Sequence, residues 1–307
     1  MTVAERRRMR VVSADGTRLH VDVQGDDSAP TLVLAHGWAC AVPFWTPMVT
    51  RLGPGLRVVR YDQRGHGRSD APPRGGYGTD ALADDLCAVL EATVPDGARA
   101  VLAGHSMGAM ALMAAAGRPV FRARAAAVAL ISTGSAGLLG GCRVVPGVGR
   151  HPRVNALAHR VALGSALPLG PVTSLTSAAL RYATMAPGAA ADVARLCALL
   201  VHACPPVPRR RWARVLAGLD LDDAVGALDV PAAVVAGTLD RLTPIAHAHR
   251  MTALLPGPAR YVEIPGAGHM TPLEAPSIVA AVLRDLADAH LAAAPAEVGG
   301  DRGRTAL

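Results

Sequence analysis

The stretch Gly104-His105-Ser106-Met107-Gly108 stands between an apolar run at 99–103 and an Ala-rich run at 109–117. This order is typical of a strand, a sharp turn and a helix, with a serine at the turn and a glycine two residues away on each side. Such a turn packs closely against the helix and the adjacent strand, so both glycine positions must lack a side chain. A helix that begins at Met107 would also aim unpaired N–H groups toward the hydroxyl oxygen of Ser106. We therefore expect Ser106 to be a nucleophile.

A seryl hydroxyl is a weak nucleophile at neutral pH, so it needs a histidine as base and a carboxylate that orients this histidine. Asp240 stands in a loop that follows the buried-strand pattern of residues 230–236. His269 stands in a Gly-rich loop that follows a further strand pattern at 260–264. The candidate residues therefore occur in the chain order Ser106, Asp240, His269.

Each of these three positions also has a simpler interpretation. Ser106 is a good helix N-cap, Asp240 fits a solvated loop acid, and His269 fits a surface histidine. The other place where a carboxylate could serve this histidine is the segment after the strand pattern at 126–131. That segment contains Ser132-Thr133-Gly134 and no carboxylate, so Asp240 has no competitor there.

Two further strand patterns end in distinctive loops. Residues 30–35 lead into His36-Gly37-Trp38-Ala39, and residues 56–60 lead into a loop that contains Arg64-Gly65-His66-Gly67. With these loops, the chain from 10 to 290 closely resembles the α/β-hydrolase superfamily, in the branch with a Ser-Met-Gly turn and a helical cap. The resemblance implies an α/β fold: a mostly parallel eight-stranded sheet with helices on both faces and an inserted helical cap.

The same resemblance assigns roles to individual residues. Ser106, Asp240 and His269 match the Ser-Asp-His order of the catalytic triad in this superfamily. The residue after His-Gly and the residue after the nucleophile donate backbone N–H groups to the oxyanion hole, and here these are Trp38 and Met107. Haloalkane dehalogenases and epoxide hydrolases of this fold carry Asp where this chain has Ser106, so their reactions are not expected.

The other histidines are expected to be structural. His105 is adjacent to the nucleophile in sequence, but it should pack beside the turn rather than act as the base. His36 is expected to hold the oxyanion loop by hydrogen bonds, and His66 is expected to support its own loop. His247 and His249 are two residues apart, so they do not share a helix face, and the chain has no zinc-ligand spacing. We expect no metal and no organic cofactor.

The strand and helix patterns also predict the domain organisation. Alternation at 10–24 predicts a β-hairpin, and alternating strands and helices predict a core made of 1–134 and 230–291. Between these segments the alternation stops, and helix-like runs broken by Pro and Gly predict an inserted cap at 135–229. The tail at 292–307 is expected to be disordered. Within the cap, one predicted helix has an apolar face made of Leu196, Leu199, Leu200 and Val201.

Composition narrows the possible partners. The 307-residue chain has a formal net charge of +7, but its basic residues are Arg, they are spread over the chain, and only 3% of residues are aromatic. This favours a solvated basic surface over nucleic-acid binding. The sequence contains neither an apolar signal-peptide core nor a stretch suited to an integral membrane segment. An odd number of cysteines without close pairing favours reduced thiols and a cytoplasmic location, and no motif indicates the oligomeric state.

These features predict a serine hydrolase that cleaves a carboxylic ester, lactone or thioester through an acyl-enzyme. The substrate is expected to be a small to medium-sized, apolar acyl compound held under the cap. A carbon–carbon bond hydrolase of the same fold is an alternative, although such relatives often have Asn and Gly where this chain has His105 and Ala109. Acyl transfer, cyclisation or perhydrolysis would use the same residues. A non-catalytic binding protein is the alternative from another class, but such relatives usually lose a triad residue.

Overall fold

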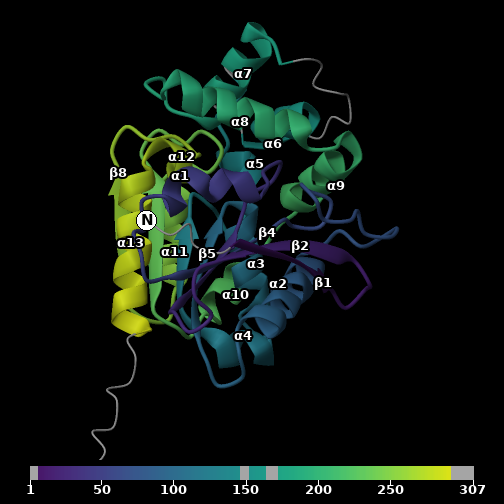
Figure 1. Cartoon of the computed structure of the whole chain (residues 1–307). Coiled ribbons are helices and arrows are strands. Elements are labelled where there is room, and N and C mark those ends of the chain that lie inside the picture. The colour runs from purple at the N-terminus through teal and green to yellow at the C-terminus, as the bar shows by residue number, and fades with distance from the viewer. Residues whose placement is uncertain (1–5, 146–151, 164–171, 292–307) are drawn as a thin grey trace, which may run out of the picture.

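The computed structural model describes residues 6–145, 152–163 and 172–291. At its centre is an eight-stranded sheet in the order β1-β2-β4-β3-β5-β6-β7-β8 (Figure 1). Strand β2 pairs antiparallel with β1 and with β4, whereas all other neighbouring strands are parallel. The predicted fold class is therefore confirmed. The strands are β1 (Arg6–Val12), β2 (Arg18–Gln24), β3 (Thr31–Ala35), β4 (Arg57–Tyr61), β5 (Ala100–His105), β6 (Ala125–Ile131), β7 (Ala232–Gly237) and β8 (Ala259–Ile264).

The predicted hairpin at 10–24 is the pair β1 and β2, and its turn contains Gly16 with a φ of 83°. A positive φ costs glycine little because it has no Cβ. The helices around the sheet alternate with the strands along the chain, which puts the loops that carry chemistry at the carboxyl ends of parallel strands. These helices are α1 (Thr46–Val49), α2 (Thr79–Thr93), α3 (Met107–Ala115), α4 (Pro119–Arg124), α10 (Asp222–Gly226), α11 (Ala246–Leu254), α12 (Thr271–Glu274) and α13 (Pro276–His290).

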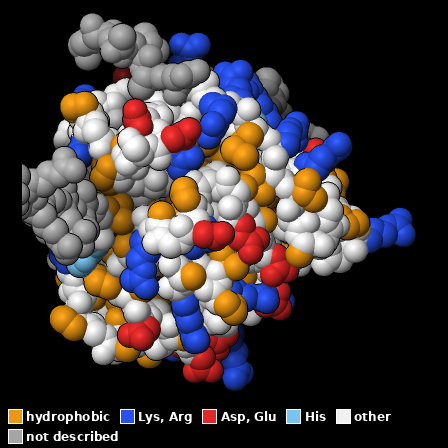
Figure 2. Space-filling model, turned by 60° about the horizontal axis from the view of Figure 1, so that its bottom comes forward, with side chains coloured by type: hydrophobic (Ala, Val, Ile, Leu, Met, Phe, Trp, Pro, Cys, Tyr) orange, Lys and Arg blue, Asp and Glu red, His pale blue; other side chains and the backbone are white. Residues whose placement is uncertain are grey.

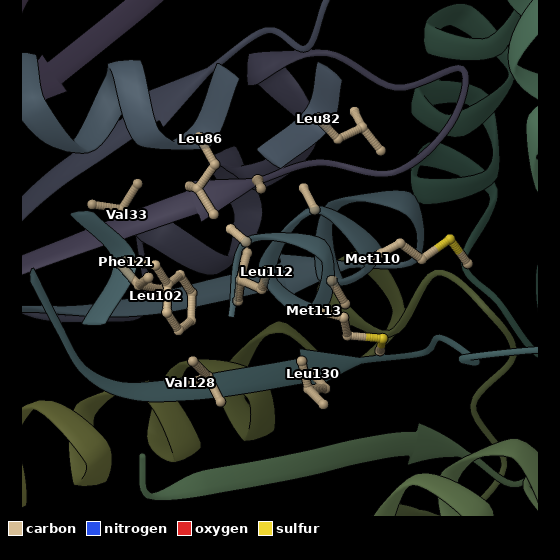
Figure 3. Packing of buried hydrophobic residues seen from close by; sticks show 14 of the residues in the cluster. Val33, Leu82, Leu86, Leu102, Met110, Leu112, Met113, Phe121, Val128 and Leu130 are labelled. Atoms are coloured by element: carbon tan, nitrogen blue, oxygen red, sulfur yellow. The ribbon is translucent and has the colours of Figure 1, made fainter. Parts of the chain in front are cut away.

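The sheet separates two apolar cores because successive side chains of a strand point to opposite faces. In β3, Val33 belongs to one core and Leu34 to the other. Helices α2, α3 and α11 cover the first face, and α1 and α13 cover the second. Figure 3 shows the first core, where Leu82 and Leu86 of α2 and Leu112 of α3 face side chains of the central strands.

Helices connect β6 to β7 and gather above one end of the sheet, at the top of Figure 1. The segment leaves and rejoins the core at one place, where Ala136 and Asp220 form an isolated antiparallel bridge. After this bridge, α10 packs against α3 and α11. Residues 146–151 and 164–171 of this segment, like the tail at 292–307, lie outside the described residues. Its remaining helices are α5 (Leu138–Gly141), α6 (Pro152–Leu163), α7 (Ser174–Thr184), α8 (Ala191–Ala203) and α9 (Pro206–Ala217).

The inward face of α8 differs from the predicted one. Leu199 is 48% exposed, whereas Cys197 and Val201 are buried and belong to the second core. The cause is helical geometry: Cys197 and Val201 are one turn apart, whereas Leu199 lies about 200° around the helix from Cys197. The prediction for Leu199 was therefore wrong because the run of aliphatic residues extends beyond the stripe that can face the core.

The basic residues do not form a single-sign field on the face shown in Figure 2, where Arg side chains are intermixed with Asp and Glu. Arginines also form ion pairs with carboxylates at the surface, such as Arg260 with Asp285 at 2.8 Å. All five cysteines lie in described segments and are free thiols. Among the described residues, no helix is long and apolar enough to cross a membrane.

Candidate active site

Ser106 occupies the turn between β5 and α3. Its φ of 52° is unusual for a residue with a side chain, and such backbone costs about 1–3 kcal/mol and tends to occur at functional sites. The neighbouring glycines permit the turn, because a Cβ at Gly104 would overlap Ala109 and a Cβ at Gly108 would overlap the carbonyl of Ala35. Ser106 is half-buried, whereas the residues on either side of it are buried. The turn thus leaves this serine partly exposed.

Asp240 lies in the loop after β7 and is fixed by four hydrogen bonds. Its Oδ1 accepts the backbone N–H groups of Leu242 and Thr243, both at 2.8 Å. Its Oδ2 accepts the hydroxyl of Thr243 at 2.8 Å and Nδ1–H of His269 at 2.8 Å. Asp240 is 5% exposed and His269 is 4% exposed. The two residues predicted from separate loops are therefore brought together in a buried, strongly oriented pair.

The loop that carries His269 is held from both sides. Its backbone N–H donates to the carbonyl of Thr184 at 2.9 Å. The carboxylate of Glu274 accepts the backbone N–H groups of Ala186 at 2.8 Å, Gly268 at 3.0 Å and Met270 at 3.0 Å. Burial raises the pKa of Glu274, while these N–H groups counteract the rise. Glu274 thus ties the histidine loop to the end of α7.

His105 is the link between the serine turn and the histidine loop. Its ring lies between Phe44, at 4.6 Å between centroids, and His269, at 5.0 Å. Its Nε2–H donates to the backbone carbonyl of His269 at 3.0 Å, and burial lowers its pKa well below the usual value. The prediction that His105 is a packed neighbour is confirmed. His269 consequently lies beside the residue that precedes Ser106.

The loop after β3 is built around two neutral histidines. His36 donates from Nδ1 to the carbonyl of Gly37 at 2.8 Å and accepts at Nε2 from Gln63 N–H at 3.0 Å. His66 accepts the N–H of Ala39 at Nε2, at 3.1 Å. Burial lowers the pKa of His36 to about 4 and that of His66 to about 3. Both histidines therefore support the loop of Trp38. This role was predicted for His36, whereas His66 was expected to support only its own loop.

Three side chains of this site were missed by the sequence analysis. Trp38 was considered only for its backbone, yet its indole Nε1–H donates to the carbonyl of Arg209 in α9 at 3.0 Å. The indole Nε1–H of Trp212, also in α9, donates to the carbonyl of Arg64 in the loop after β4 at 3.2 Å. Thr243 and Glu274 are the other two. The sequence offered one signal for each of these two residues, namely its position. Thr243 stands three residues after Asp240, and Glu274 stands five residues after His269.

The structure also addresses the expectation about metals. Among the residues it describes, no group of three His, Cys, Asp or Glu side chains could hold a metal ion. His247 packs closely against glycine backbone, since a Cβ at Gly134 would lie 2.8 Å from its Nδ1. Burial lowers the pKa of His247.

A family model described as "Alpha/beta hydrolase family" matches residues 32–282, most of the chain and all of the loops described above. The chain belongs to the alpha/beta hydrolase family. Members of this family are enzymes. This alpha/beta hydrolase has the sheet order given above, a strained turn at Ser106 and a buried pair of Asp240 and His269. The pairing of Ser106 with His269 and the oxyanion hole at Trp38 and Met107 remain predictions.

Individual relatives match only parts of the chain. A Mycobacterium tuberculosis protein named "Probable oxidoreductase EphD" is 35% identical over 133 residues, which are 43% of this chain and 22% of that protein. A non-heme chloroperoxidase from Streptomyces lividans is 38% identical over 99 residues, or 32% of this chain and 35% of that protein. The alpha/beta hydrolase thus aligns with about a fifth to a third of the length of these curated relatives.

Solved structures match over nearly the whole chain. A thermophilic esterase from Thermogutta terrifontis superimposes with a TM-score of 0.73, covering 92% of this chain and 99% of the esterase at 24% identity. An identity at this level establishes the shared fold and leaves the reaction to be argued from the site.

Proposed function

We propose that this protein is a serine hydrolase that cleaves a carboxylic ester, lactone or thioester through an acyl-enzyme. The observation that carries the proposal is the 2.8 Å hydrogen bond between Asp240 Oδ2 and His269 Nδ1. A carboxylate at Nδ1 fixes the tautomer in which Nε2 is unprotonated and can accept a proton. The strained turn of Ser106 supplies the hydroxyl that would donate it.

In the first half of the reaction, His269 Nε2 would remove the proton from Ser106 Oγ as this oxygen attacks the acyl carbon. The carbonyl π bond opens, and its electron pair becomes an oxyanion. The resulting imidazolium is stabilised by Asp240, whose position is fixed by Thr243 and the loop N–H groups. When the carbonyl re-forms, the bond to the leaving oxygen or sulfur breaks, and the imidazolium returns its proton to that atom. Water then attacks the acyl-enzyme in the same way and releases the acid.

The oxyanion would be stabilised by the backbone N–H groups of Trp38 and Met107. Met107 is the first residue of α3, so its N–H has no partner within the helix. The loop of Trp38 is fixed in advance by His36 and His66, and preorganised donors are the most effective way to stabilise developing charge.

We propose that residues 135–229 act as the cap over this site and that residues 1–134 and 230–291 form the core. Two contacts support this role: Trp38 hydrogen-bonds α9 beside the serine turn, and His269 hydrogen-bonds the end of α7. The inner face of α8 contributes Cys197 and Val201 to an apolar cluster that includes Met270, next to the proposed base. Apolar surroundings favour a largely apolar acyl group.

The proposal is tested with a fluorophosphonate probe, which phosphonylates an activated serine, and with p-nitrophenyl esters of increasing acyl length. The purified protein should be labelled, and it should hydrolyse short or medium-length esters without added metal, also in the presence of a chelator. Ser106→Ala should abolish both. Ser28→Ala is the matched control, because Ser28 is an exposed loop residue distant from the turn in sequence.

The outcomes distinguish the alternatives. Labelling at Ser106 without hydrolysis of any ester would favour the carbon–carbon hydrolase or the acyl-transferring enzyme. Absence of labelling in a folded protein would favour a binding protein. Equal labelling of the wild type and Ser106→Ala would show that another residue is the nucleophile.

A further inference from the structure

A surface cavity of about 410 Å³ that is open to solvent lies outside the proposed triad, between α7, α8 and the loop after β7. It is within the size range of small-molecule sites. In Figure 1, α7 and α8 lie together above the sheet. Three arginines from three different segments line it: Arg181 of α7, Arg195 of α8 and Arg241 of the loop. None of the other residues that line the cavity is acidic.

Two of these guanidinium groups are held in place by the protein itself. Arg241 donates from Nη1 to the carbonyls of Tyr182 at 3.0 Å and Met185 at 3.3 Å, and its guanidinium lies 4.5 Å from the centroid of the Tyr182 ring. Arg181 donates to the carbonyl of Pro187. Both Arg241 bonds use one nitrogen, which leaves its Nη2 and Nε donors available to a ligand.

These charges are not neutralised by neighbouring carboxylates. Among the described residues, no Asp or Glu oxygen lies within 4.0 Å of the side-chain nitrogens of Arg181, Arg195 or Arg241. Elsewhere in the fold arginines do have such partners: Arg64 pairs with Asp85 at 2.5 Å. Three like charges around one cavity repel each other, and an anion that enters the cavity would relieve this repulsion.

The geometry points to a binding site for a small amphipathic carboxylate in this cavity. The carboxylate group would accept hydrogen bonds from the guanidinium groups, which match its planar shape. The apolar part of the ligand would lie on Ala178, Met185 and Ala194. This site was not visible in the sequence, because Arg181, Arg195 and Arg241 share no motif, and the sequence analysis accordingly expected only apolar recognition.

The inference stands apart from the proposed function, because the site does not include Ser106. The test measures the binding of octanoate by calorimetry to the Ser106→Ala protein, with octanamide as the neutral analogue. Octanoate should bind and octanamide should not bind detectably at the same concentrations. Because Ser106→Ala removes only the proposed nucleophile, failure of this test would leave the proposed reaction untouched, and failure of the labelling experiment would leave this site untouched.

Two further variants locate the binding. Arg195→Glu should weaken octanoate binding by about tenfold or more, since it replaces an attractive charge by a repulsive one. Arg214→Glu, a charge reversal at an exposed arginine of α9 outside the cavity, is the matched control and should leave binding unchanged. Ala178→Trp retains all charges but fills the cavity, and it should also weaken binding. Thermal melts verify that each variant is folded.

The inference is overturned if octanoate does not bind, if octanamide binds equally well, or if Arg195→Glu and Ala178→Trp bind octanoate as the parent protein does. It is equally overturned if Arg214→Glu weakens binding as much as Arg195→Glu, because the effect would then reflect net charge. A loss with Arg195→Glu and Ala178→Trp alone supports the site.

Discussion

The indole Nε1 of Trp38 donates a hydrogen bond of 3.0 Å to the backbone carbonyl of Arg209, a residue 171 positions away in the chain. This bond joins the proposed oxyanion loop to α9. The side chain of Trp212, from the same helix, returns a hydrogen bond to the carbonyl of Arg64 in the core. Helix α9 is therefore held to the loop after β3 by the indole of Trp38 and to the loop after β4 by the indole of Trp212.

Trp38→Phe retains the backbone N–H and much of the aromatic packing but removes the bond to Arg209. A neutral hydrogen bond contributes about 1 kcal/mol, so we expect kcat for p-nitrophenyl esters to fall several-fold and KM to rise. Fluorophosphonate labelling should persist. Steady-state kinetics decide this prediction, and a loss of activity as complete as that of Ser106→Ala would contradict it.

Asp240→Asn should lower kcat by about 10⁴-fold at neutral pH, because the amide favours the wrong imidazole tautomer. Thr243→Val removes the hydroxyl that orients Asp240 and should give a smaller reduction, whereas Thr243→Ser should retain most of the activity. The measurement is kcat and KM for one ester across these variants. If Asp240→Asn were as active as the wild type, the hydrogen bond between Asp240 and His269 would have no catalytic role.

Glu274→Gln should disturb the loop of His269, because an amide cannot accept all three backbone N–H groups that the carboxylate binds. An unsatisfied buried donor costs about 1–3 kcal/mol, so the midpoint of urea unfolding should shift to lower urea and kcat should fall. Glu263→Gln, at a more exposed position on β8, is the control. Equal kinetics and stability in both variants would exclude a positioning role for Glu274.

Acid should destabilise the fold through His36 and His66. Both are neutral when folded, with pKa values lowered by burial to about 4 and about 3, whereas the unfolded chain protonates them near pH 6.5. The unfolded state therefore binds more protons below about pH 6.5, and the free energy of unfolding falls until the folded rings also protonate. For His36 alone this amounts to about 3 kcal/mol between pH 7 and pH 4.

Urea unfolding at a series of pH values measures this loss. His66→Gln removes one titrating ring and keeps a side-chain acceptor near Ala39, so its stability should decline less steeply between pH 6.5 and pH 4 than that of the wild type. Parallel profiles for the two proteins would contradict the assignment of buried, neutral histidines.

The sequence was sufficient for features that depend on local pattern. The uninterrupted apolar runs of β3 and β5, whose residues are all buried, and the glycines around Ser106 follow from strand and turn geometry, so the sheet and the serine turn could be predicted. The chain order of Asp240 and His269 was enough to nominate them, because parallel strands bring their carboxyl ends to one edge.

Features that depend on packing between distant segments could not be predicted. The hydrogen bond from Trp38 to Arg209 ends on a backbone carbonyl, which every residue type has. The sequence therefore contains no pattern that identifies this partner. The convergence of Arg195 with Arg241 depends on how α8 sits above the loop after β7. The exposure of Leu199 depends on which part of an aliphatic run faces inward. Each is decided by tertiary geometry rather than by residue type.

The central claim, that Ser106 is activated by the Asp240–His269 pair, is tested most directly by trapping the acyl-enzyme. Rapid acid quenching of the reaction with p-nitrophenyl acetate, followed by peptide mass spectrometry, identifies the acylated residue. We predict an acetyl group on Ser106 in the wild type, and neither this group nor ester turnover in His269→Ala or Ser106→Ala. An acetyl group on a different residue, or turnover by Ser106→Ala at the wild-type rate, would contradict the claim.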